Sequence, residues 1–394
     1  MTNKKEKRKV PDLRFPEFNG EWEEKSIECC FKFYDNLRKP VTSSKRKKGI
    51  YPYYGATGVI DYVDDYIFDG EYLLIGEDGA NIVSRNSPLI YHVKGKMWIN
   101  NHAHVLVPKN KMFKFFKNSL DKVNYIPYNT GTAQPKLNIE SLKKIPLYVP
   151  NNDEQQKIGE FFSKLDRQIE LEEKKLALLE EQKKGYMQKI FSQELRFKDE
   201  KGEEYPEWEL KSISEISSVI TKGTTPKNYD NNGGVNFIKV ESIDETGEIV
   251  ITSKIDYHTH VNDLKRSILK PGDILFSIAG SIGKTIIIKE ENLPANTNQA
   301  LAIIRIDNEN IQYINYFLIS KKNKILKENI STIGAQPNLS LKQISNIKID
   351  LPCNLEKQII SQFFYKLESK IKAQTNKVVK YKERKVSLIS KIFI

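Results

Sequence analysis

The clearest pattern in the chain is a heptad repeat of apolar residues that occurs twice, first in residues 153–192 and again before the C-terminus. Apolar side chains at alternating spacings of three and four fall on positions a and d of a helix that packs along another helix. The positions are Phe162, Leu165, Ile169, Leu176, Leu179, Tyr186 and Ile190 in the first stretch, and Phe364, Leu367, Ile371, Val378, Tyr381, Leu388 and Ile392 in the second. The pattern predicts two long helices.

Polar residues interrupt both heptad repeats at the same two places. Glu172 and Gln374 occupy one d position, and Lys183 and Lys385 occupy one a position. A polar residue in such a seam lowers stability and fixes register or partner. About 39 helical residues span roughly 58 Å, which is too long for a plain amphipathic helix that covers a small globular core. We therefore expect the two helices to pair with each other, antiparallel.

The segments that precede the helices have a different pattern. Short runs of β-branched and aromatic residues are separated by Gly, Asn and Asp, which is typical of strands and turns. Similar stretches occur in both segments, at 68–80 and 270–285 and at 100–108 and 297–305. Residues Met112–Leu120 and Ile311–Ile330 are predicted to be helical. The predicted fold class is α+β, with two β-rich globular domains in tandem pseudo-twofold repeat, joined by the antiparallel coiled coil.

A nearly repeated sextet supports this duplication. "TAQPKL" at 132–137 and "GAQPNL" at 334–339 lie 202 positions apart, so Gln134 matches Gln336. The same offset continues without a gap through the heptad repeats. A fixed offset of this kind indicates that a structural unit occurs twice.

The two units also begin alike, since Trp22 and Trp208 stand in similar surroundings. The predicted organisation is a basic disordered arm at 1–12, a first domain at 13–150, a helix at 151–194, a second domain at 195–352 and a helix at 353–394.

Composition narrows the function class. The net charge of +12 and the pI of about 9.2 are typical of a nucleic-acid partner, although many basic proteins bind none. No apolar run approaches 18 residues, and no apolar segment follows the basic N-terminus, so neither a membrane span nor a secretory signal is expected. Cys29, Cys30 and Cys353 form no disulfide pattern, which favours a cytoplasmic protein.

Two His-x-His pairs could each be half of a metal site. They are His102 with His104 and His258 with His260. A complete site needs three or four ligands, and no further ligand stands at a matching distance in the sequence. We therefore predict no metal, with these histidines as ordinary strand or loop residues.

Catalytic motifs are also missing from the sequence. "GSIGKT" at 280–285 resembles a phosphate-binding loop, but Ile278 stands where that motif requires Gly. The sequence contains no Gly-x-Ser-x-Gly motif and no Asn-Pro-Pro-aromatic tetrapeptide of the kind found in amino-methylating enzymes. We expect that the chain is not an enzyme by itself.

The remaining polar residues favour DNA recognition. Lys and Arg in 38–49 and 221–234 could neutralise phosphates, and Arg, Asn and Gln near turns could contact base edges. The candidates are Arg38, Lys45, Arg46, Lys47, Glu77, Asn81, Arg85, Asn101 and His102 in the first domain, and Lys222, Thr224, Lys227, Ser281, Lys284, Asn298 and Gln299 in the second. The alternative for each of them is a solvated loop residue.

Together these features resemble the specificity (S) subunit of type I restriction-modification systems. The resemblance is carried by "TAQPKL" and "GAQPNL" before long helices, by "FPEFNGEWEEKSI", by "GEYLLIGEDGA" and by "GDILFSIAGSIGKT" with "NTNQALAI" after it, and covers nearly the whole chain. It implies two target-recognition domains that each read one half of a bipartite double-stranded DNA site. It also implies that the two helices set the spacer between the halves and dock methylation subunits, typically two, and that restriction subunits join the complex.

The resemblance further implies that S-adenosylmethionine, ATP and Mg belong to the partner subunits, so no cofactor is expected on this chain. The two domains differ in sequence, which predicts unlike half-sites and an asymmetric target. One alternative is an RNA-binding or assembly scaffold protein with a helical dimerisation arm. A second alternative is a self-sufficient nuclease. Neither alternative requires two unlike domains on equivalent scaffolds.

Overall fold

The computed structural model describes residues 9–230, 232–244, 248–329 and 338–394. Most of the predicted arm at 1–12 therefore lies outside the described residues, as do Gln336 and its neighbours in the second sextet. The chain forms two compact units. The first unit contains residues 1–175 and 374–394, and the second contains 176–373. Each unit thus combines one β-rich domain with one half of each long helix.

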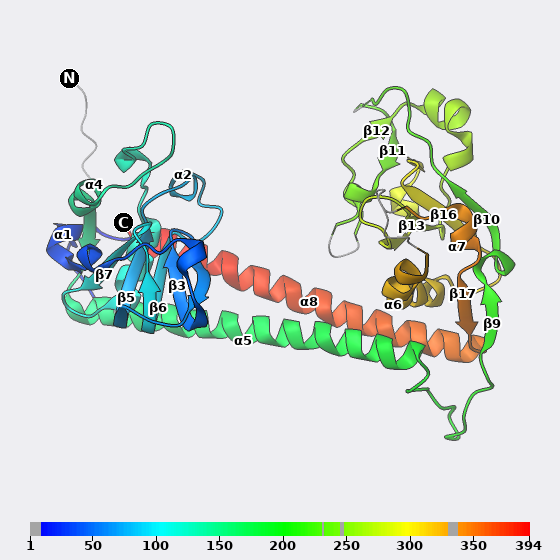
Figure 1. Cartoon of the computed structure of the whole chain (residues 1–394), viewed down its shortest axis with the longest axis horizontal. Coiled ribbons are helices and arrows are strands. Elements are labelled where there is room, and N and C mark those ends of the chain that lie inside the picture. Colours follow the sequence, from blue (N-terminus) through cyan, green and yellow to red (C-terminus); the bar gives the residue numbers. More distant parts are fainter. Residues whose placement is uncertain (1–8, 231, 245–247, 330–337) are drawn as a thin grey trace. The chain divides into compact units, whose positions relative to one another are not determined.

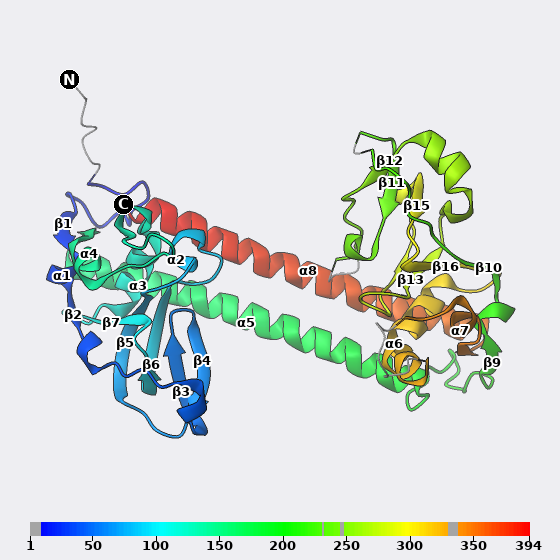
Figure 2. The same ribbon diagram turned by 45° about the horizontal axis from the view of Figure 1, so that its top comes forward.

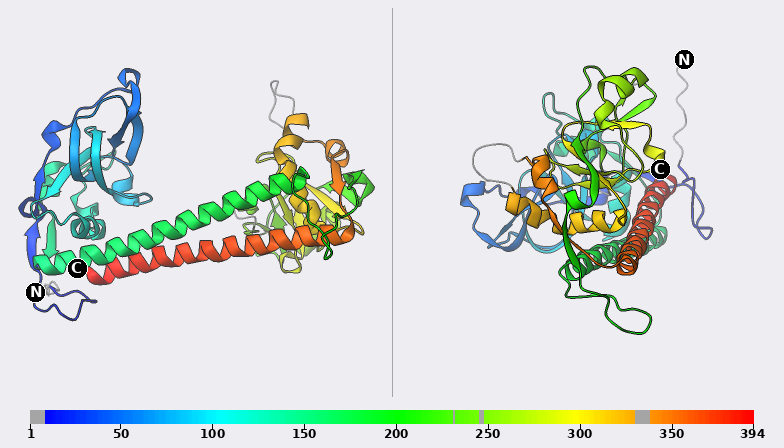
Figure 3. Two further views of the ribbon diagram at one scale, coloured as in Figure 1. Left: turned by 90° about the horizontal axis from the view of Figure 1, so that it is seen from below. Right: turned by 90° about the vertical axis from the view of Figure 1, so that its right-hand side faces the viewer.

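The two long helices are α5, Asn152–Phe191, and α8, Asn354–Ile392. The Asn151 side chain caps the start of α5 by accepting a hydrogen bond from the Glu154 backbone N–H at 2.9 Å. In each unit one half of α5 lies along one half of α8 (Figures 1 and 3). Together with the two β-rich domains, these helices confirm the predicted α+β fold class.

The direction of pairing is shown by ion pairs within each unit. Lys385 lies 2.6 Å from Asp166 in the first unit, and Lys183 lies 2.6 Å from Glu368 in the second. Glu173 in the first unit pairs with Lys382 at 2.7 Å, so within this unit the partner's number on α8 falls as the residue number rises along α5, and the helices form an antiparallel coiled coil.

The seam residues differ in how deeply they lie. Tyr186 is 40% exposed, and its ring packs edge-on against Phe363. The neighbouring Met187 is buried, although it is not one of the predicted a and d positions. The buried seam residues are Phe162, Ile169, Ile190, Phe364, Val378 and Ile392, and the half-buried ones are Leu165, Leu176, Leu179, Leu367, Ile371, Tyr381 and Leu388.

The first domain is built on one six-stranded sheet in the order β2-β7-β5-β6-β3-β4. Only β3 and β6 run parallel, and the other neighbours are antiparallel. Helix α3 packs against β5, β6 and β7. The strands are β1 Glu23–Ser26, β2 Phe31–Phe33, β3 Lys48–Gly55, β4 Gly58–Val63, β5 Phe68–Gly76, β6 Ile90–Ile99, β7 Ala103–Pro108 and β8 Pro146–Val149. The helices are α1 Ile27–Cys30, α2 Asn81–Ser84, α3 Phe113–Lys122 and α4 Ile139–Lys144, with 3-10 turns at Asp35–Leu37, Ser43–Lys45 and Ile126–Tyr128.

The second domain is built mainly on two sheets, in the orders β10-β16-β13-β14 and β12-β11-β15 (Figure 2), beside the two-stranded sheet of β17 and β9. Its strands are β9 Glu209–Ser212, β10 Ser217–Lys222, β11 Val235–Ile238, β12 Lys254–Ile255, β13 Ile274–Ser277, β14 Thr285–Ile287, β15 Ala295–Thr297, β16 Leu301–Ile306 and β17 Lys348–Leu351. The helices are α6 Ile311–Asn329 and α7 Leu341–Ser345, with 3-10 turns at Ile213–Glu215, Val240–Ser242, Lys265–Ser267 and Glu290–Asn292 and a π turn at Thr259–Asp263. The predicted helices at 112–120 and 311–330 are thus present as α3 and α6, with Ile330 outside the described residues.

Each domain closes onto its long helix in the same way. Strand β1 pairs with β8 in the first domain, and β9 pairs with β17 in the second. Because β8 and β17 lead directly into α5 and α8, these pairings fix where each helix leaves its domain. Among the described residues, no helix has an apolar stretch long enough to cross a membrane.

Candidate nucleic-acid interface

Three chain segments meet at one end of the first domain's sheet. They are the turn after β5, the turn before β7 and the end of the sextet that contains Gln134. The Leu137 N–H donates to the Glu77 carbonyl at 2.8 Å, and the Glu77 N–H donates to the His102 carbonyl at 2.8 Å. The Leu137 side chain is fully buried, so it anchors the sextet to the core. We call this meeting point the junction.

The second domain has the same junction. The Leu339 N–H donates to the Ile278 carbonyl at 2.9 Å, and the Ile278 N–H donates to the Ala300 carbonyl at 2.8 Å. Leu339 is also buried. Leu137 and Leu339, the last residue of each sextet, are therefore held in the same way, by a buried side chain and by a backbone N–H that bonds the turn after β5 or β13.

The turn before β7 in the first domain and the turn before β16 in the second are held in the same way. The Asn100 side chain accepts a hydrogen bond from the His102 N–H at 2.8 Å. The Asn298 side chain accepts one from the Ala300 N–H at 3.2 Å. Such Asx turns need a short polar side chain at that position, which explains the polar amides before the second apolar strand of each domain.

A buried network of charges lies beneath the first junction. Arg38 donates to the Glu77 carboxylate at 2.7 Å and pairs with Asp35 at 3.3 Å. The His104 ring contacts the Asp35 carboxylate through Nδ1 at 2.6 Å and the Leu137 carbonyl through Nε2 at 2.7 Å. Charge-assisted hydrogen bonds of this kind are the stronger ones and hold the segments in one arrangement.

The ligand atoms of Asp35, Glu77 and His104 lie within 4.8 Å of one another, so we tested whether they fit a metal ion. The Arg38 guanidinium already bridges the two carboxylates. Both His104 ring nitrogens face acceptors, so neither is open to a metal. The arrangement fits an ion-pair network rather than a metal site.

Above this network, several side chains of the first junction face solvent. His102 is 53% exposed on its side chain, and its Nδ1 lies 2.7 Å from Asp78. Asn101 is exposed beside it, and Lys136 reaches toward Glu77 at 3.3 Å. Predicted residues Arg38, Glu77, Asn101 and His102 are thus brought together. Asp78 and Lys136 were missed, although Lys136 belongs to the repeated sextet and Asp78 follows Glu77.

The other candidates in the first domain have structural contacts of their own. Both ends of the Asn81 amide bond Ser87 at 3.0 Å and close a loop. Arg85 donates to the Asp121 carbonyl at 3.0 Å. Arg46 bonds Asp61 at 3.0 Å and lies over the ring of Tyr53, whereas the structure leaves Lys45 and Lys47 exposed.

The second domain also gathers some of its candidates at its junction. The Thr225 hydroxyl donates to the Gln299 side chain, which is exposed. The Thr224 N–H bonds the Thr297 carbonyl at 3.1 Å, which places the end of β10 next to this turn. Lys284 instead donates to the Ile243 carbonyl at 2.9 Å.

The remaining candidates of the second domain are solvent-facing or structural. Lys222, Lys227 and Ser281 are exposed, and the Ser281 carbonyl accepts a hydrogen bond from the Ser277 hydroxyl at 2.6 Å. None of these positions is shown to touch DNA, so the contact residues stay predictions.

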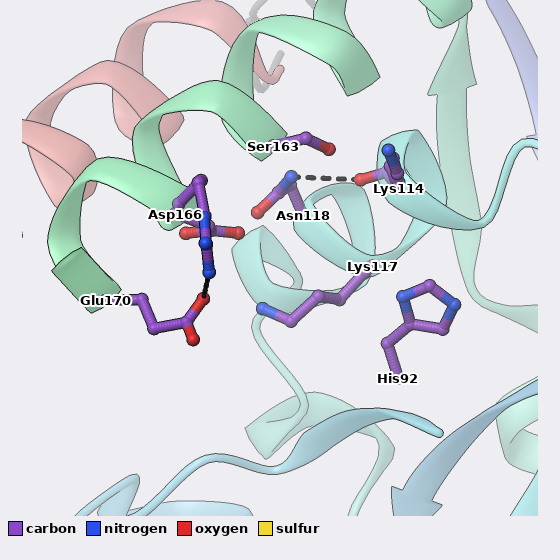
Figure 4. Close-up of a pocket in the computed structure, with 8 residues that line it drawn as sticks. His92, Lys114, Lys117, Asn118, Ser163, Asp166 and Glu170 are labelled. Atoms are coloured by element: carbon purple, nitrogen blue, oxygen red, sulfur yellow. Dashed lines mark hydrogen bonds and ion pairs between the residues drawn. The ribbon is translucent and has the colours of Figure 1, made fainter. Parts of the chain in front are cut away.

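A pocket of about 260 Å³ lies elsewhere in the first unit, between α3 and α5 (Figure 4). It contains a serine, a histidine and carboxylates, but these do not form a catalytic set. The Ser163 hydroxyl donates to the Gly159 carbonyl of its own helix, and His92 bonds Glu71. Asp166 pairs with Lys385. Each group is engaged elsewhere, so the pocket lacks the nucleophile–base contact that covalent catalysis needs.

Comparisons with known proteins agree with the duplicated architecture. Residues 19–181 and 205–381 each match the family described as the type I restriction modification DNA specificity domain. The chain is 31% identical over 362 residues to the Haemophilus influenzae protein S.HindORF215P, described as a type I restriction enzyme specificity subunit. The match covers 89% of this chain and 88% of that protein. The MjaVIII specificity subunit of Methanocaldococcus jannaschii is 25% identical over 366 residues, covering 88% of this chain and 85% of that protein.

Solved structures share the fold. The S subunit of a type I restriction-modification system from M. genitalium aligns with a TM-score of 0.62 at 15% identity, over 98% of this chain and 99% of that one. A chain from a study of complex assembly in the type I system aligns with a TM-score of 0.54 at 13% identity, over 92% and 97%. With two family matches that together span most of its length, the chain belongs to the family of type I restriction-modification DNA specificity subunits.

Proposed function

We propose that each domain reads one half of an asymmetric, bipartite DNA site within a type I restriction-modification complex. The observation that carries this proposal is the junction, which has the same backbone hydrogen bonds in both domains but different side chains. Glu77 and His102 in the first domain correspond to Ile278 and Ala300 in the second. A constant backbone with exchangeable side chains suits a protein that must present different hydrogen-bonding groups from one scaffold.

The chemistry at the two junctions would favour different bases. The first presents His102, Asn101 and Lys136, and the second presents Gln299 and Thr225. Asn and Gln amides match adenine, and cationic donors match guanine, in the major groove. Exposed lysines such as Lys45 and Lys227 would neutralise phosphates and make the affinity depend on salt.

The long helices would set the distance between the two half-sites. At 1.5 Å per residue, the 40 residues of α5 measure about 60 Å, which is nearly two turns of B-DNA. The same helices would dock methylation subunits, two of them because the repeat provides two equivalent surfaces, and restriction subunits would join through the complex. Methyl transfer and ATP-dependent cleavage, with S-adenosylmethionine, ATP and Mg, would reside on those partners, and this chain would contribute no catalysis. The comparisons give no support to an RNA-binding or scaffold function.

Mapping of methylated bases tests the proposal. Cells that express the chain with its methylation subunit should acquire a split motif, two short sequences around a fixed run of unspecified bases. Cells that express either protein alone should not. An active pair that methylates DNA without a split motif would contradict the two-reader scheme.

Variants at the two junctions assign the halves. His102→Ala should weaken or relax the half-site read by the first domain, and Gln299→Ala should do so for the second. Loss of a good base contact costs about 1–3 kcal/mol of discrimination. The other half of the motif serves as the internal control in each case. Variants that change both halves together would show that the junctions do not read bases separately.

A further inference from the structure

The coiled coil contains one polar layer that is nearly closed to solvent. The Gln374 Nε2 donates to the Glu172 carboxylate at 2.7 Å and to the Glu172 carbonyl at 2.9 Å. Both residues are 6% exposed. Lys377 and Gln168 each donate to the other carboxylate oxygen at 2.7 Å. Every acceptor of this carboxylate therefore has a partner.

The two residues of this layer occupy the same position in the two repeats, because 172 and 374 differ by the repeat offset of 202. In this layer a position therefore meets its own equivalent. Two ion pairs occur in reciprocal form. Lys183 pairs with Glu368, and Lys385 pairs with Asp166, where each member of one pair lies 202 positions from a member of the other. The Lys382–Glu173 pair at 2.7 Å is not of this kind, because Glu180 and Thr375 stand at the equivalent positions, and it lies between exposed side chains that contribute little.

This symmetry has a consequence for wrong pairings. If α5 paired in the same register with α5 of a second copy, Lys183 would still meet Asp166. If α8 paired with a second α8, Lys385 would still meet Glu368. The reciprocal ion pairs therefore do not distinguish like from unlike helices. The apolar seam does not distinguish them strongly either, because apolar residues occupy the same heptad positions in both helices.

The central layer does distinguish them. Two copies of α5 would place Glu172 against Glu172, which brings two carboxylates together and removes both amide hydrogen bonds. Two copies of α8 would place Gln374 against Gln374, which leaves Lys377 without its carboxylate. Only the unlike pair satisfies all the groups. Polar residues at single seam positions are known to specify partners in this way, at a cost in stability.

We propose that the Glu172–Gln374 layer makes the chain pair its own two unlike helices and reject helix exchange with a second copy of itself. Every chain carries two nearly equivalent helices, so exchange between copies is the competing assembly that the sequence must disfavour. Glu172 and Gln374 differ in charge, whereas the other polar position of the seam holds lysine in both helices, Lys183 and Lys385.

Four variants of the full-length chain test the proposal. Gln374→Glu should lower the melting temperature, because it places two carboxylates in the layer. The exchanged variant Glu172→Gln/Gln374→Glu should restore it, because Lys175 occupies the position equivalent to Lys377 and can meet the new carboxylate. Glu172→Gln keeps the shape of the side chain and places two glutamines in the layer, and Glu172→Leu/Gln374→Leu places two leucines there. In both variants the layer contains the same residues whether α5 pairs with α8 or a helix pairs with its own copy.

Light scattering over a range of concentrations reads out partner choice. The Glu172→Gln and double-Leu variants should contain about tenfold more dimer than the original chain, as expected for a modest loss of discrimination. The double-Leu variant should nevertheless melt at a higher temperature, since apolar residues replace a buried polar pair. If the layer had only a structural role, the double-Leu variant would be more stable than the original chain but would contain no more dimer. If neither variant dimerises more, or if the exchanged variant loses as much stability as the two single variants combined, the proposal is wrong.

Discussion

The two domains follow the same strand order but differ in one strand. In the first domain β6 is a continuous strand of ten residues that borders β5 along most of its length and β3 at its end. In the second domain β14 borders β13, and a separate strand, β15, runs parallel to β11. One strand of the first domain thus corresponds to two short strands of the second.

The sequence explains this difference. Between β14 and β15 stand Lys289, Glu290 and Glu291, followed shortly by Pro294. Proline has no N–H to donate to a sheet, and three consecutive charged residues cannot alternate between a buried and a solvated face. The Asn292 side chain instead accepts a hydrogen bond from the Lys289 N–H at 2.8 Å and closes a turn. The domains therefore differ in the strand that follows β5 or β13, while the backbone hydrogen bonds of the junction are kept.

An equivalent arginine–glutamate pair holds the start of the long helix in each domain. Arg14 forms two hydrogen bonds to Glu154, at 2.8 and 2.7 Å, near the start of α5. Arg196 forms the equivalent bonds to Glu356, at 3.3 and 2.9 Å, near the start of α8. Both glutamates are fully buried. The Glu356 carboxylate, the largest cause, raises the pKa of Arg196 above its ordinary value.

A tryptophan completes the arrangement in only one domain. Trp208 Nε1 donates to Glu356 at 2.9 Å. Its counterpart Trp22 is buried, and within the described part of the chain its Nε1 has no hydrogen-bond partner. A buried donor without a partner is costly, so the same residue stabilises one domain more than the other.

The largest expected effect comes from removing the buried carboxylates. Glu154→Ala and Glu356→Ala should each cost about 3–5 kcal/mol, because each leaves an arginine without its partner. The second should cost about 1.5–3 kcal/mol more, because Trp208 also loses its charged acceptor. Urea unfolding, with hydrogen exchange to assign each transition to a unit, measures both values. Equal losses would show that the tryptophan bond contributes little.

A smaller effect is expected from the two tryptophans themselves. Trp208→Phe removes a hydrogen bond to a charged group, which is worth about 1.5–3 kcal/mol, in addition to the lost ring volume. Trp22→Phe loses the same volume but also removes an unpartnered N–H, so it should cost less. Matched thermal melts of the two variants test this difference. A greater loss for Trp22→Phe would mean that its N–H has a partner in solution.

The split strand predicts a difference in local opening. The sheet β12-β11-β15 has short strands and a small cluster of Val235, Phe237, Ile255 and Leu264. Strand β3 belongs instead to the continuous six-stranded sheet. Amides of β11 should therefore exchange with solvent at least about tenfold faster than those of Tyr53 and Tyr54 in β3. Similar exchange rates would show that the two sheets of the second domain open as one.

The parts of the molecule that were predictable from sequence are those with periodic patterns. The heptads predict α5 and α8, and the repeated sextet predicts a shared structural position, because both signals recur at fixed spacing. The role of Leu137 was not predictable, since it depends on a hydrogen bond to the Glu77 carbonyl, in a turn that is distant in sequence. The burial of Arg38 was missed for a related reason: a basic run does not reveal that Asp35 and Glu77 fold against one of its members.

The smallest expected effect concerns pH and the central layer of the coiled coil. The hydrogen bond from Gln374, followed by the one from Lys377, lowers the pKa of Glu172 from 4.5 to about 2. A carboxyl whose pKa is lower in the folded chain than in the unfolded chain stabilises the fold at pH values above its pKa in the unfolded chain. This contribution is lost as pH falls from about 4.5 toward 2. The difference in melting temperature between the original chain and Glu172→Gln should therefore be constant near neutral pH and shrink within that window.

Glu170→Gln is the matched control, because that carboxylate is exposed on the same helix and its ion pairs contribute little. If the control shows the same pH dependence, the effect belongs to the surface charge of the helix, and the layer does not depend on the ionised Glu172.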